Sequence, residues 1–311
     1  NDNNKIKISG KIIETYLNIL GKEKINNVNF NFDYNNGNLN IINLGVEYKN
    51  LNFVSKQISS NFNTDIVQIN GDFKNKINLN LISSLIDFNF KDYLNNKILL
   101  SSKSKFSISL NKKFKIKDYK LESEINFDSL KVNLDNIDLK KILKNFEKKF
   151  ILKNGKINLF LNRNNEIKFK VDSKYVLNDK EEPQEIKLKY SKINSEEKYI
   201  LNINLSEHEL DLKEINFNKK KNEELFLNLI ITQKKNIFEL NNFELFNDKN
   251  NFIIKEVEFG KNFKIKDFDL IEANYYNKNN FLNDISIKKK YNNIELKSKN
   301  FDISSDIGRE S

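Results

Sequence analysis

The sequence contains no cysteine, methionine or tryptophan, and a single proline and a single histidine among its 311 residues. Without cysteine, disulfides and thiolate metal sites are excluded. A metal site on the lone histidine, His208, lacks the further imidazole or thiolate ligands it needs. We therefore expect His208 to be an exposed residue of a turn or of a polar strand face. A chain without methionine lacks its own start residue, so we expect it to be part of a longer protein.

Signals of membrane insertion and of catalysis are also missing. No run of 18 or more apolar residues occurs, so no membrane-spanning helix is predicted within the sequence. Neither GxGxxG nor GxxxxGK is present, and Ser84 and Ser304 lie in no nucleophile elbow. Carboxylate pairs such as Glu122 and Glu124 are flanked by lysine, which is typical of a solvated strand face. We predict that the chain is not an enzyme, with no catalytic residue, no metal and no cofactor.

The formal net charge is +10, which could attract nucleic acid or anionic lipid headgroups. Lysine, however, is spread evenly along the chain, and its clusters at 219–221 and 288–290 are typical of solvated turns. Nucleic-acid binding favours aromatic residues interleaved with basic ones on one face. Here most aromatic residues share the apolar face, opposite the lysines. We therefore predict no nucleic-acid partner.

The dominant feature that is present is an alternation of apolar and polar residues, from about Val28 to Leu296. A period of two places every second side chain on the same face of a β-strand, so each run predicts a strand with one apolar and one polar face. The clearest runs supply the apolar positions Ile157, Leu159, Leu161, Ile167, Phe169, Val171, Ile186, Leu188, Leu201, Ile203 and Leu205. The chain is therefore predicted to be mainly β.

Asparagine-rich pairs between these runs predict hairpin turns, because asparagine tolerates the left-handed conformation and bonds to its own backbone. The predicted turns lie at 35–37, 111–112, 164–165, 250–251 and 292–293.

Three stretches depart from the period of two and have helical spacing instead. Residues 12–20 are followed by Gly21, which is typical of a helix end. Residues 139–150 repeat that spacing more strongly after Asp138, a candidate N-cap. Residues 81–86 suggest a further helical turn.

The first two of these helices are each followed by a similar hairpin, at a constant offset of 129 residues (142 − 13 = 129 and 161 − 32 = 129). This indicates an internal duplication. The predicted modules are 1–134 and 135–302, each a helix plus a β-groove, and 303–311 resembles the start of a third.

Many amphipathic strands in series form either a sandwich that buries its own apolar faces or an open sheet. The alternation alone does not separate the two. We predict a long, twisted antiparallel β-sheet that curls into an open apolar groove, with two or three short α-helices.

The stretch 139–161, which includes Gly155-Lys-Ile-Asn-Leu-Phe-Leu161, and the late Lys299-Asn-Phe-Asp-Ile-Ser-Ser305 resemble the AsmA-like family of Gram-negative bacteria, which includes YhdP and TamB. This resemblance implies a periplasmic protein, anchored in the inner membrane by a segment outside this sequence. It also implies a β-groove that conducts phospholipids towards the outer membrane. Glycine at strand starts is scarcer here than in that family.

The leading hypothesis is a lipid-conducting groove in which the eleven apolar positions above contact acyl chains of phospholipid or another acyl lipid. The alternative is a structural β-rich surface or fibre protein whose apolar face packs against itself.

Overall fold

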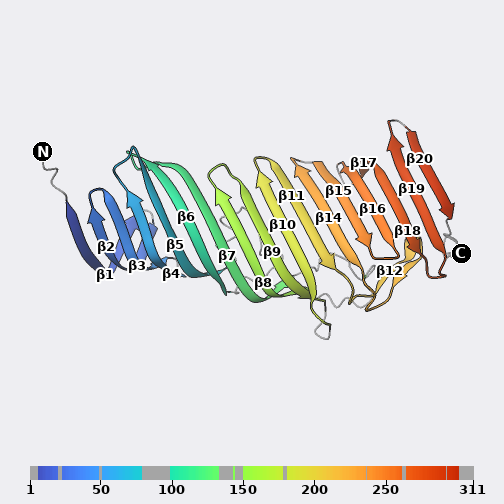
Figure 1. Ribbon diagram of the computed structural model, residues 1–311, viewed down its shortest axis with the longest axis horizontal. Helices are drawn as coiled ribbons and strands as arrows, with labels where there is room; N and C mark the ends of the chain where they lie inside the picture. Colours follow the sequence, from blue (N-terminus) through green and yellow to red (C-terminus); the bar gives the residue numbers. More distant parts are fainter. Residues whose placement is uncertain are drawn as a thin grey trace. The chain divides into compact units, whose positions relative to one another are not determined.

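The computed structural model describes residues 6–19, 23–48, 51–78, 99–132, 143, 150–177, 181–235, 237–260, 264–291 and 293–300. These residues form β-strands almost throughout (Figure 1). The strands are β1 (Lys7–Ile19), β2 (Glu23–Asn35), β3 (Asn38–Tyr48), β4 (Leu51–Asn61), β5 (Ile66–Asn78), β6 (Leu99–Asn111), β7 (Ile116–Val132), β8 (Phe150–Asn162), β9 (Ile167–Val176), β10 (Gln184–Ile193), β11 (Glu196–Asn204), β12 (Leu210–Leu212), β13 (Phe217–Lys219), β14 (Phe226–Lys234), β15 (Ile237–Phe246), β16 (Asn251–Phe259), β17 (Ile265–Asp267), β18 (Leu270–Tyr276), β19 (Leu282–Lys290) and β20 (Asn293–Asn300).

Eighteen of the strands belong to one sheet, and β12 and β13 form a separate two-stranded sheet. Every strand pair whose register is described is antiparallel, and each strand pairs mainly with its neighbours in sequence. Among the described residues β1 pairs with β2 alone and β20 with β19 alone, so the sheet is not closed. The predicted fold class, a long antiparallel sheet built from amphipathic strands, is confirmed.

The chain divides into two compact units. The N-terminal unit comprises Asn1–Phe127 and Lys156–Phe169, and the C-terminal unit comprises Asp128–Gly155 and Lys170–Ser311. In the N-terminal unit β1 to β7 pair in chain order. In the C-terminal unit the order is β10, β11, β14, β15, β16, β18, β19 and β20 (Figure 1). The module boundaries predicted from the sequence remain a prediction.

The helix predicted at 12–20 is wrong over the described residues, because Lys7–Ile19 is strand β1. Register shifts lie between Ile12 and Thr15 and between Thr15 and Leu17, and Glu14 has a positive φ of 49°. A β-bulge inserts an extra residue on one strand and so shifts the alternation by one position. The first shift places its extra residue on β1 and the second places its extra residue on β2. The alternation along β1 is therefore displaced once, and the apolar residues on either side of the displacement take a spacing that resembles a helix.

The other predicted helices fall mostly outside the described residues. Residues 81–86 are not described, and within 139–150 only two positions are. Leu143 forms an isolated antiparallel bridge with Leu210, and Phe150 begins β8. The one helical segment among the described residues is a short 3₁₀ turn, η3 (Lys213–Ile215).

The predicted turns at 35–37, 111–112, 164–165 and 250–251 lie where consecutive strands connect, as expected, whereas Asn292 of the turn predicted at 292–293 lies outside the described residues. Asn36 and Gly37 both have positive φ, 46° and 78°, in the turn between β2 and β3. Asn111 accepts the backbone N–H groups of Lys113 and Lys115 at 3.0 and 2.9 Å in the turn before β7. Asparagine thus supplies both the left-handed backbone and the hydrogen bonds that these tight connections need.

The N-terminal unit has its own apolar face, on which glycine and phenylalanine face each other across strands. A Cβ atom on Gly10 would lie 2.6 Å from the ring of Phe32, and one on Gly71 would lie 2.9 Å from the ring of Phe106. The rings therefore occupy the space that a side chain on either glycine would need. Further along this face Ser104 and Ser123 are buried and share a hydrogen bond of 2.8 Å.

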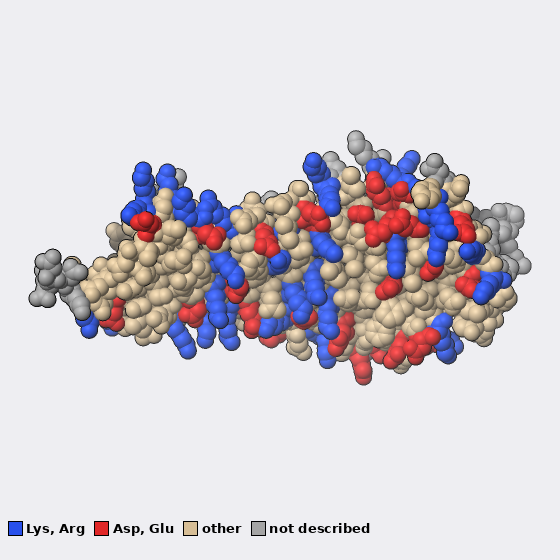
Figure 2. Space-filling view, turned by 45° about the horizontal axis from the view of Figure 1, so that its top comes forward, with Lys and Arg blue, Asp and Glu red and all other residues tan. Residues whose placement is uncertain are grey.

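Charged side chains of both signs lie close to one another over the visible surface (Figure 2). Many form cross-strand or same-strand ion pairs, such as Lys156 with Glu124 at 2.6 Å and Lys266 with Glu258 at 3.0 Å. Exposed pairs of this kind contribute little stability, but they keep the polar face of the sheet solvated.

Candidate functional site

The candidate site is the apolar face of the sheet in the C-terminal unit. Residues that are directly paired in an antiparallel sheet point to the same side, so the registers define rows of side chains that cross the strands. The first row is Ile186, Ile203, Leu227, Leu245, Phe252, Ala273 and Ile285. The second row is Leu188, Leu201, Leu229, Phe243, Ile254, Ile271, Ile287 and Leu296. The third row is Tyr190, Tyr199, Ile231, Leu240 and Val257.

The second row is apolar at every position and crosses eight strands without a polar interruption. Its members from Leu188 to Ile287 are partly exposed, and Leu296 at the end of the row is 66% exposed. With strands about 4.8 Å apart, the row is about 34 Å long. That is longer than one layer of acyl chains in a bilayer, about half of the 30 Å hydrocarbon thickness.

The opposite face of the same strands is polar. Asn202 donates to the side chain of Asn228 at 2.6 Å, and Asn228 donates to Glu244 at 3.3 Å. Two strands further on, Ser286 donates to Glu272 at 3.2 Å. These cross-strand hydrogen bonds lie on the face opposite the three apolar rows. The sheet therefore has one polar and one apolar face, as the alternation predicts.

The first row from Leu227 to Ala273 is covered by a small second layer, the cover hairpin, formed by β12, η3 and β13. Phe217 of the cover hairpin is 1% exposed, and its ring lies 5.1 Å from Phe252 and 6.0 Å from Tyr275. The hydroxyl of Tyr275 donates to the backbone oxygen of Ile215 at 2.8 Å. With Leu210 and Leu245, these residues form the main buried core of the unit.

The third row leads to a polar rim at the turn between β10 and β11. Tyr190 and Tyr199 lie 5.1 Å apart on neighbouring strands, and the Tyr199 hydroxyl donates to Glu197 at 2.8 Å. Glu197 also pairs with Lys192 at 3.1 Å. Although partial burial acts in the opposite direction, these hydrogen bonds and the lysine charge hold the pKa of Glu197 below its usual value. The apolar face therefore has the cover hairpin on one side and a charged rim on the other.

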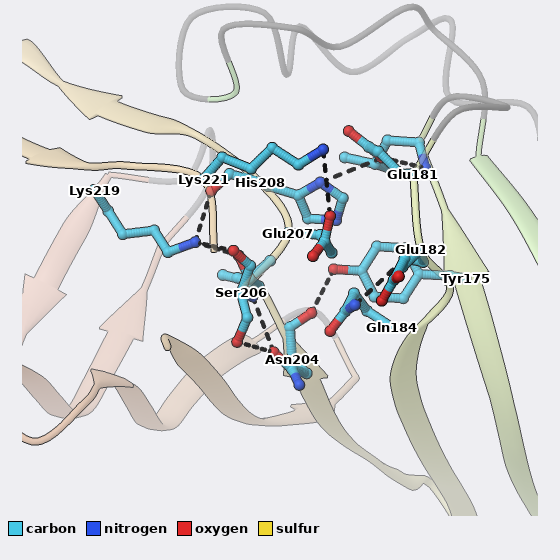
Figure 3. A network of polar contacts seen from close by, with 12 residues as sticks. Tyr175, Glu181, Glu182, Gln184, Asn204, Ser206, Glu207, His208, Lys219 and Lys221 are labelled. Carbon is cyan, nitrogen blue, oxygen red and sulfur yellow. Dashed lines mark hydrogen bonds and ion pairs between the residues drawn. The ribbon is translucent and has the colours of Figure 1, made fainter. Parts of the chain in front are cut away.

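A polar network ties the cover hairpin to the sheet (Figure 3). The ammonium of Lys219, which is 1% exposed, donates to the backbone oxygens of Leu205 (2.9 Å), His208 (2.8 Å) and Ser206. Burial lowers the pKa of Lys219 to about 8. Three carbonyl oxygens around one buried ammonium fix the turn before β12.

His208 is 4% exposed, so the expectation of an exposed histidine is wrong. Its Nδ1 lies 3.5 Å from Glu181, and its ring lies 5.3 Å from that of Tyr175, whose hydroxyl donates to the backbone of Asn204 at 2.7 Å. Burial lowers the pKa of His208 although Glu181 acts in the opposite direction. Within the described part of the chain, no group of three or more His, Cys, Asp or Glu residues could hold a metal ion.

The expectation of solvated turns at the lysine clusters holds only in part. Lys220 and Lys221 are exposed, whereas Lys219 is buried as described above. The second cluster, 288–290, ends strand β19 and is not a turn, although Lys288 and Lys290 are exposed and pair with Glu272 and Glu295 at 3.4 and 3.1 Å.

The structure brings together some of the apolar positions singled out from the sequence. Ile186 pairs with Ile203 in the first row, and Leu188 pairs with Leu201 in the second. Leu205 packs against the core under the cover hairpin.

The remaining predicted positions lie on β8 and β9. Ile157, Leu159, Leu161, Ile167 and Phe169 belong to the N-terminal unit, where Leu159 and Leu161 are only 6% and 7% exposed. Val171 is partly exposed and belongs to the C-terminal unit. Their contact with acyl chains remains a prediction.

The members of the second row beyond β11 were not predicted from the sequence as lipid contacts; they are Leu229, Phe243, Ile254, Ile271, Ile287 and Leu296. Each of them lies in an alternating run, so the side of the strand on which it lies was predictable. The strand register, which aligns these residues in one row, was not.

Comparison with known proteins found no matching family model, no matching curated protein and no matching solved structure. In the described segments, none of the helical structure is long and apolar enough to cross a lipid bilayer.

Proposed function

We propose that the apolar face of the C-terminal unit binds the acyl chains of phospholipid or another acyl lipid. The observation that carries the proposal is the second row, a line of partly exposed leucine, isoleucine and phenylalanine side chains across eight strands. Broad apolar surfaces on soluble proteins mark binding sites, because leaving them in water is unfavourable.

The mechanism is passive. An acyl chain lying along the row removes methylene groups from water, at about 0.8 kcal/mol each. The row offers similar side chains at every strand, from Leu188 to Ile287, so that no single position holds a lipid much more tightly than the next. A chain can therefore shift along the row without leaving the apolar surface.

The two sides of the face support one orientation of the lipid. The cover hairpin packs mainly on the first row, so we assign the acyl chains to the partly exposed side chains of the second row and of the adjoining third row. The rim of Tyr190, Tyr199, Glu197 and Lys192 offers hydroxyls and charges of both signs. Tyrosine at an apolar–polar boundary is typical of residues that contact the headgroup region. Headgroups therefore lie at this rim.

We infer that this surface serves the function that the AsmA-like resemblance implies. In that function the chain is a segment of a periplasmic groove, which shields acyl chains between the inner and outer membranes. A periplasmic location and a membrane anchor outside this sequence are part of the same proposal, and they rest on the resemblance alone.

The test compares two neighbouring residues of β14 that point to opposite faces. Leu229→Asp places a carboxylate in the second row, where burial against an acyl chain is costly. Ile230→Asp makes the same kind of change on the polar face. Binding of cis-parinaric acid, a fluorescent fatty acid, is titrated for both variants, and lipids retained from the expression host are identified by mass spectrometry.

We expect Leu229→Asp to weaken binding by about ten-fold or more, which corresponds to about 1.4 kcal/mol, and Ile230→Asp to leave it nearly unchanged. Circular dichroism checks that both variants keep their β structure. Equal binding by the two variants contradicts the proposed face.

The second candidate function is a structural protein with a self-packed core. The cover hairpin favours it, because it buries Leu245 and Phe252 without any ligand. A chain that retains no lipid from the host and does not bind cis-parinaric acid supports this candidate instead.

A further inference from the structure

We propose that an open polar pocket beside the cover hairpin binds a carbohydrate. The pocket has a volume of about 1040 Å³. It is lined by the turn between β15 and β16, the turn between β18 and β19, strand β13 and the segment that follows β13. All of these elements belong to the C-terminal unit. The inference does not depend on lipid binding, because the described lining includes no leucine, isoleucine, valine or phenylalanine.

The two turns that line the pocket are held in shape by asparagine side chains. Oδ1 of Asn247 accepts the backbone N–H of Asn250 at 2.7 Å in the turn between β15 and β16. In the turn between β18 and β19, Oδ1 of Asn277 accepts the backbone N–H groups of Asn279 and Phe281 at 2.9 and 3.0 Å. A pocket whose walls are ordered before the ligand arrives loses less conformational entropy on binding.

Lys278 joins the turn between β18 and β19 to the cover hairpin. Its Nζ lies 2.9 Å from Oδ1 of Asp211 in β12, and its backbone N–H donates to the backbone oxygen of Asn216 at 3.0 Å. These contacts hold two sides of the pocket together. They also compensate the charge of Lys278 within the protein.

Other polar side chains of the lining are left for a ligand. Within the described part of the chain, Asn218, Tyr276 and Asn280 make no side-chain hydrogen bond or ion pair. Asn280 is exposed and Tyr276 is 44% exposed, so solvent reaches both. Each amide offers two donor hydrogens and an acceptor oxygen, and the tyrosine hydroxyl offers one donor and an acceptor.

The charges of the pocket favour a neutral ligand. Four carboxylates and three lysines line it, and one of these lysines, Lys278, is already paired with Asp211. Neither an anion nor a cation therefore meets a large excess of opposite charge. The five asparagines of the lining instead suit groups that both donate and accept hydrogen bonds. Sugar hydroxyls have this property, and a tyrosine ring offers an apolar surface for the C–H groups of a sugar ring.

The test measures binding of three disaccharides, maltose, cellobiose and N,N′-diacetylchitobiose, to the full chain by saturation-transfer NMR. Inorganic phosphate is the anionic comparison. Asn218→Ala removes one amide from the lining. Asn280→Gly removes a second amide, and glycine tolerates the positive φ of 57° at this position. Asn279→Ala is the matched control, because Asn279 is exposed in the same turn and does not line the pocket.

We expect at least one disaccharide to bind with a millimolar or lower Kd. Asn218→Ala and Asn280→Gly should each weaken binding about three- to ten-fold, as expected for the loss of one hydrogen-bonding group. Asn279→Ala should change the Kd by less than about two-fold. Circular dichroism checks that all variants keep their β structure, and unchanged binding of cis-parinaric acid separates this site from the apolar face.

A thiol-protection measurement places the ligand in the pocket. Because the sequence contains no cysteine, Lys249→Cys introduces a single thiol into the lining and Asn279→Cys introduces one outside it. The bound disaccharide should slow alkylation of the first thiol by iodoacetamide and leave the second unchanged. Three outcomes overturn the proposal: no disaccharide binds, both thiols are protected equally, or phosphate binds more tightly than every disaccharide.

Discussion

Phe217 of the cover hairpin offers a direct measure of how firmly this hairpin is attached to the sheet. The ring is 1% exposed and contacts the rings of Phe252 and Tyr275 at 5.1 and 6.0 Å, both close to edge-on. Replacing a buried phenylalanine by alanine costs about 3–5 kcal/mol, to which the aromatic pairs contribute about 0.5–1.5 kcal/mol each. Phe217→Ala should therefore destabilise the cover hairpin by about 3–5 kcal/mol.

Native-state hydrogen exchange measures this loss locally, which matters in a chain of two units whose unfolding need not be two-state. At about 1.4 kcal/mol per factor of ten, amides of β12, β13 and the strands beneath should exchange about two to four powers of ten faster. Exchange in β5 and β6 of the N-terminal unit should not change.

Tyr291→Ala is the control, because Tyr291 is 97% exposed in a turn and its removal should cost less than about 0.5 kcal/mol. A loss below about 1 kcal/mol for Phe217→Ala would refute the view that this hairpin is part of the core.

Further expectations concern single contacts. Gly37→Ala should lower the free energy of unfolding by about 1–3 kcal/mol, the cost of a strained backbone, because Gly37 has a φ of +78° and a Cβ would lie 2.0 Å from Asn63. Gly45→Ala is the control, since a Cβ there would meet no atom within 4 Å, and it should cost less than about 1 kcal/mol. Urea unfolding compares the two variants. Because burial lowers the pKa of Lys219 to about 8 from 10.5, the unfolded chain binds more protons between these values. The free energy of unfolding should therefore rise as the pH is raised from 8 to 10.5, and Lys219→Met should abolish this rise. Tyr275→Phe removes one buried hydrogen bond to the cover hairpin and should cost about 1 kcal/mol in thermal or urea unfolding.

The strands and their turns were predictable because their causes are local. A period of two and an asparagine pair act over a few residues, and the structure places turns at 35–37 and 111–112 as expected. The apolar face also follows from alternation, since the polar ladder of Asn202 and Asn228 lies on the other side.

The bulge of β1 was not predictable in this way. A bulge depends on the partner strand, and its only local sign is a positive φ at Glu14, which no residue preference indicates. The extra residue disturbs the alternation, so that Ile13, Leu17 and Leu20, at intervals of four and three residues, have the spacing of a helix. Helical spacing over so few residues is therefore also consistent with a bulged strand.

The polar network was not predictable because it depends on contacts distant in sequence. Lys219 stands in a run of three lysines, and its burial requires the carbonyl oxygens of Leu205, Ser206 and His208 from an earlier turn. Burial of His208 likewise requires Glu181 and Tyr175 from another segment. From residue type alone, a lysine and a histidine are expected to be exposed to solvent. Here contacts with residues distant in sequence bury both side chains.

The pairing of each strand with its predecessor has a consequence for biosynthesis. In the N-terminal unit each strand from β2 to β7 pairs with the strand that precedes it in the sequence. During translation the partner of each new strand has therefore already been synthesised. Assembly can follow translation without waiting for distant segments. A consequence is that every incomplete chain exposes an unpaired strand edge, which can pair with other chains until the next strand is synthesised.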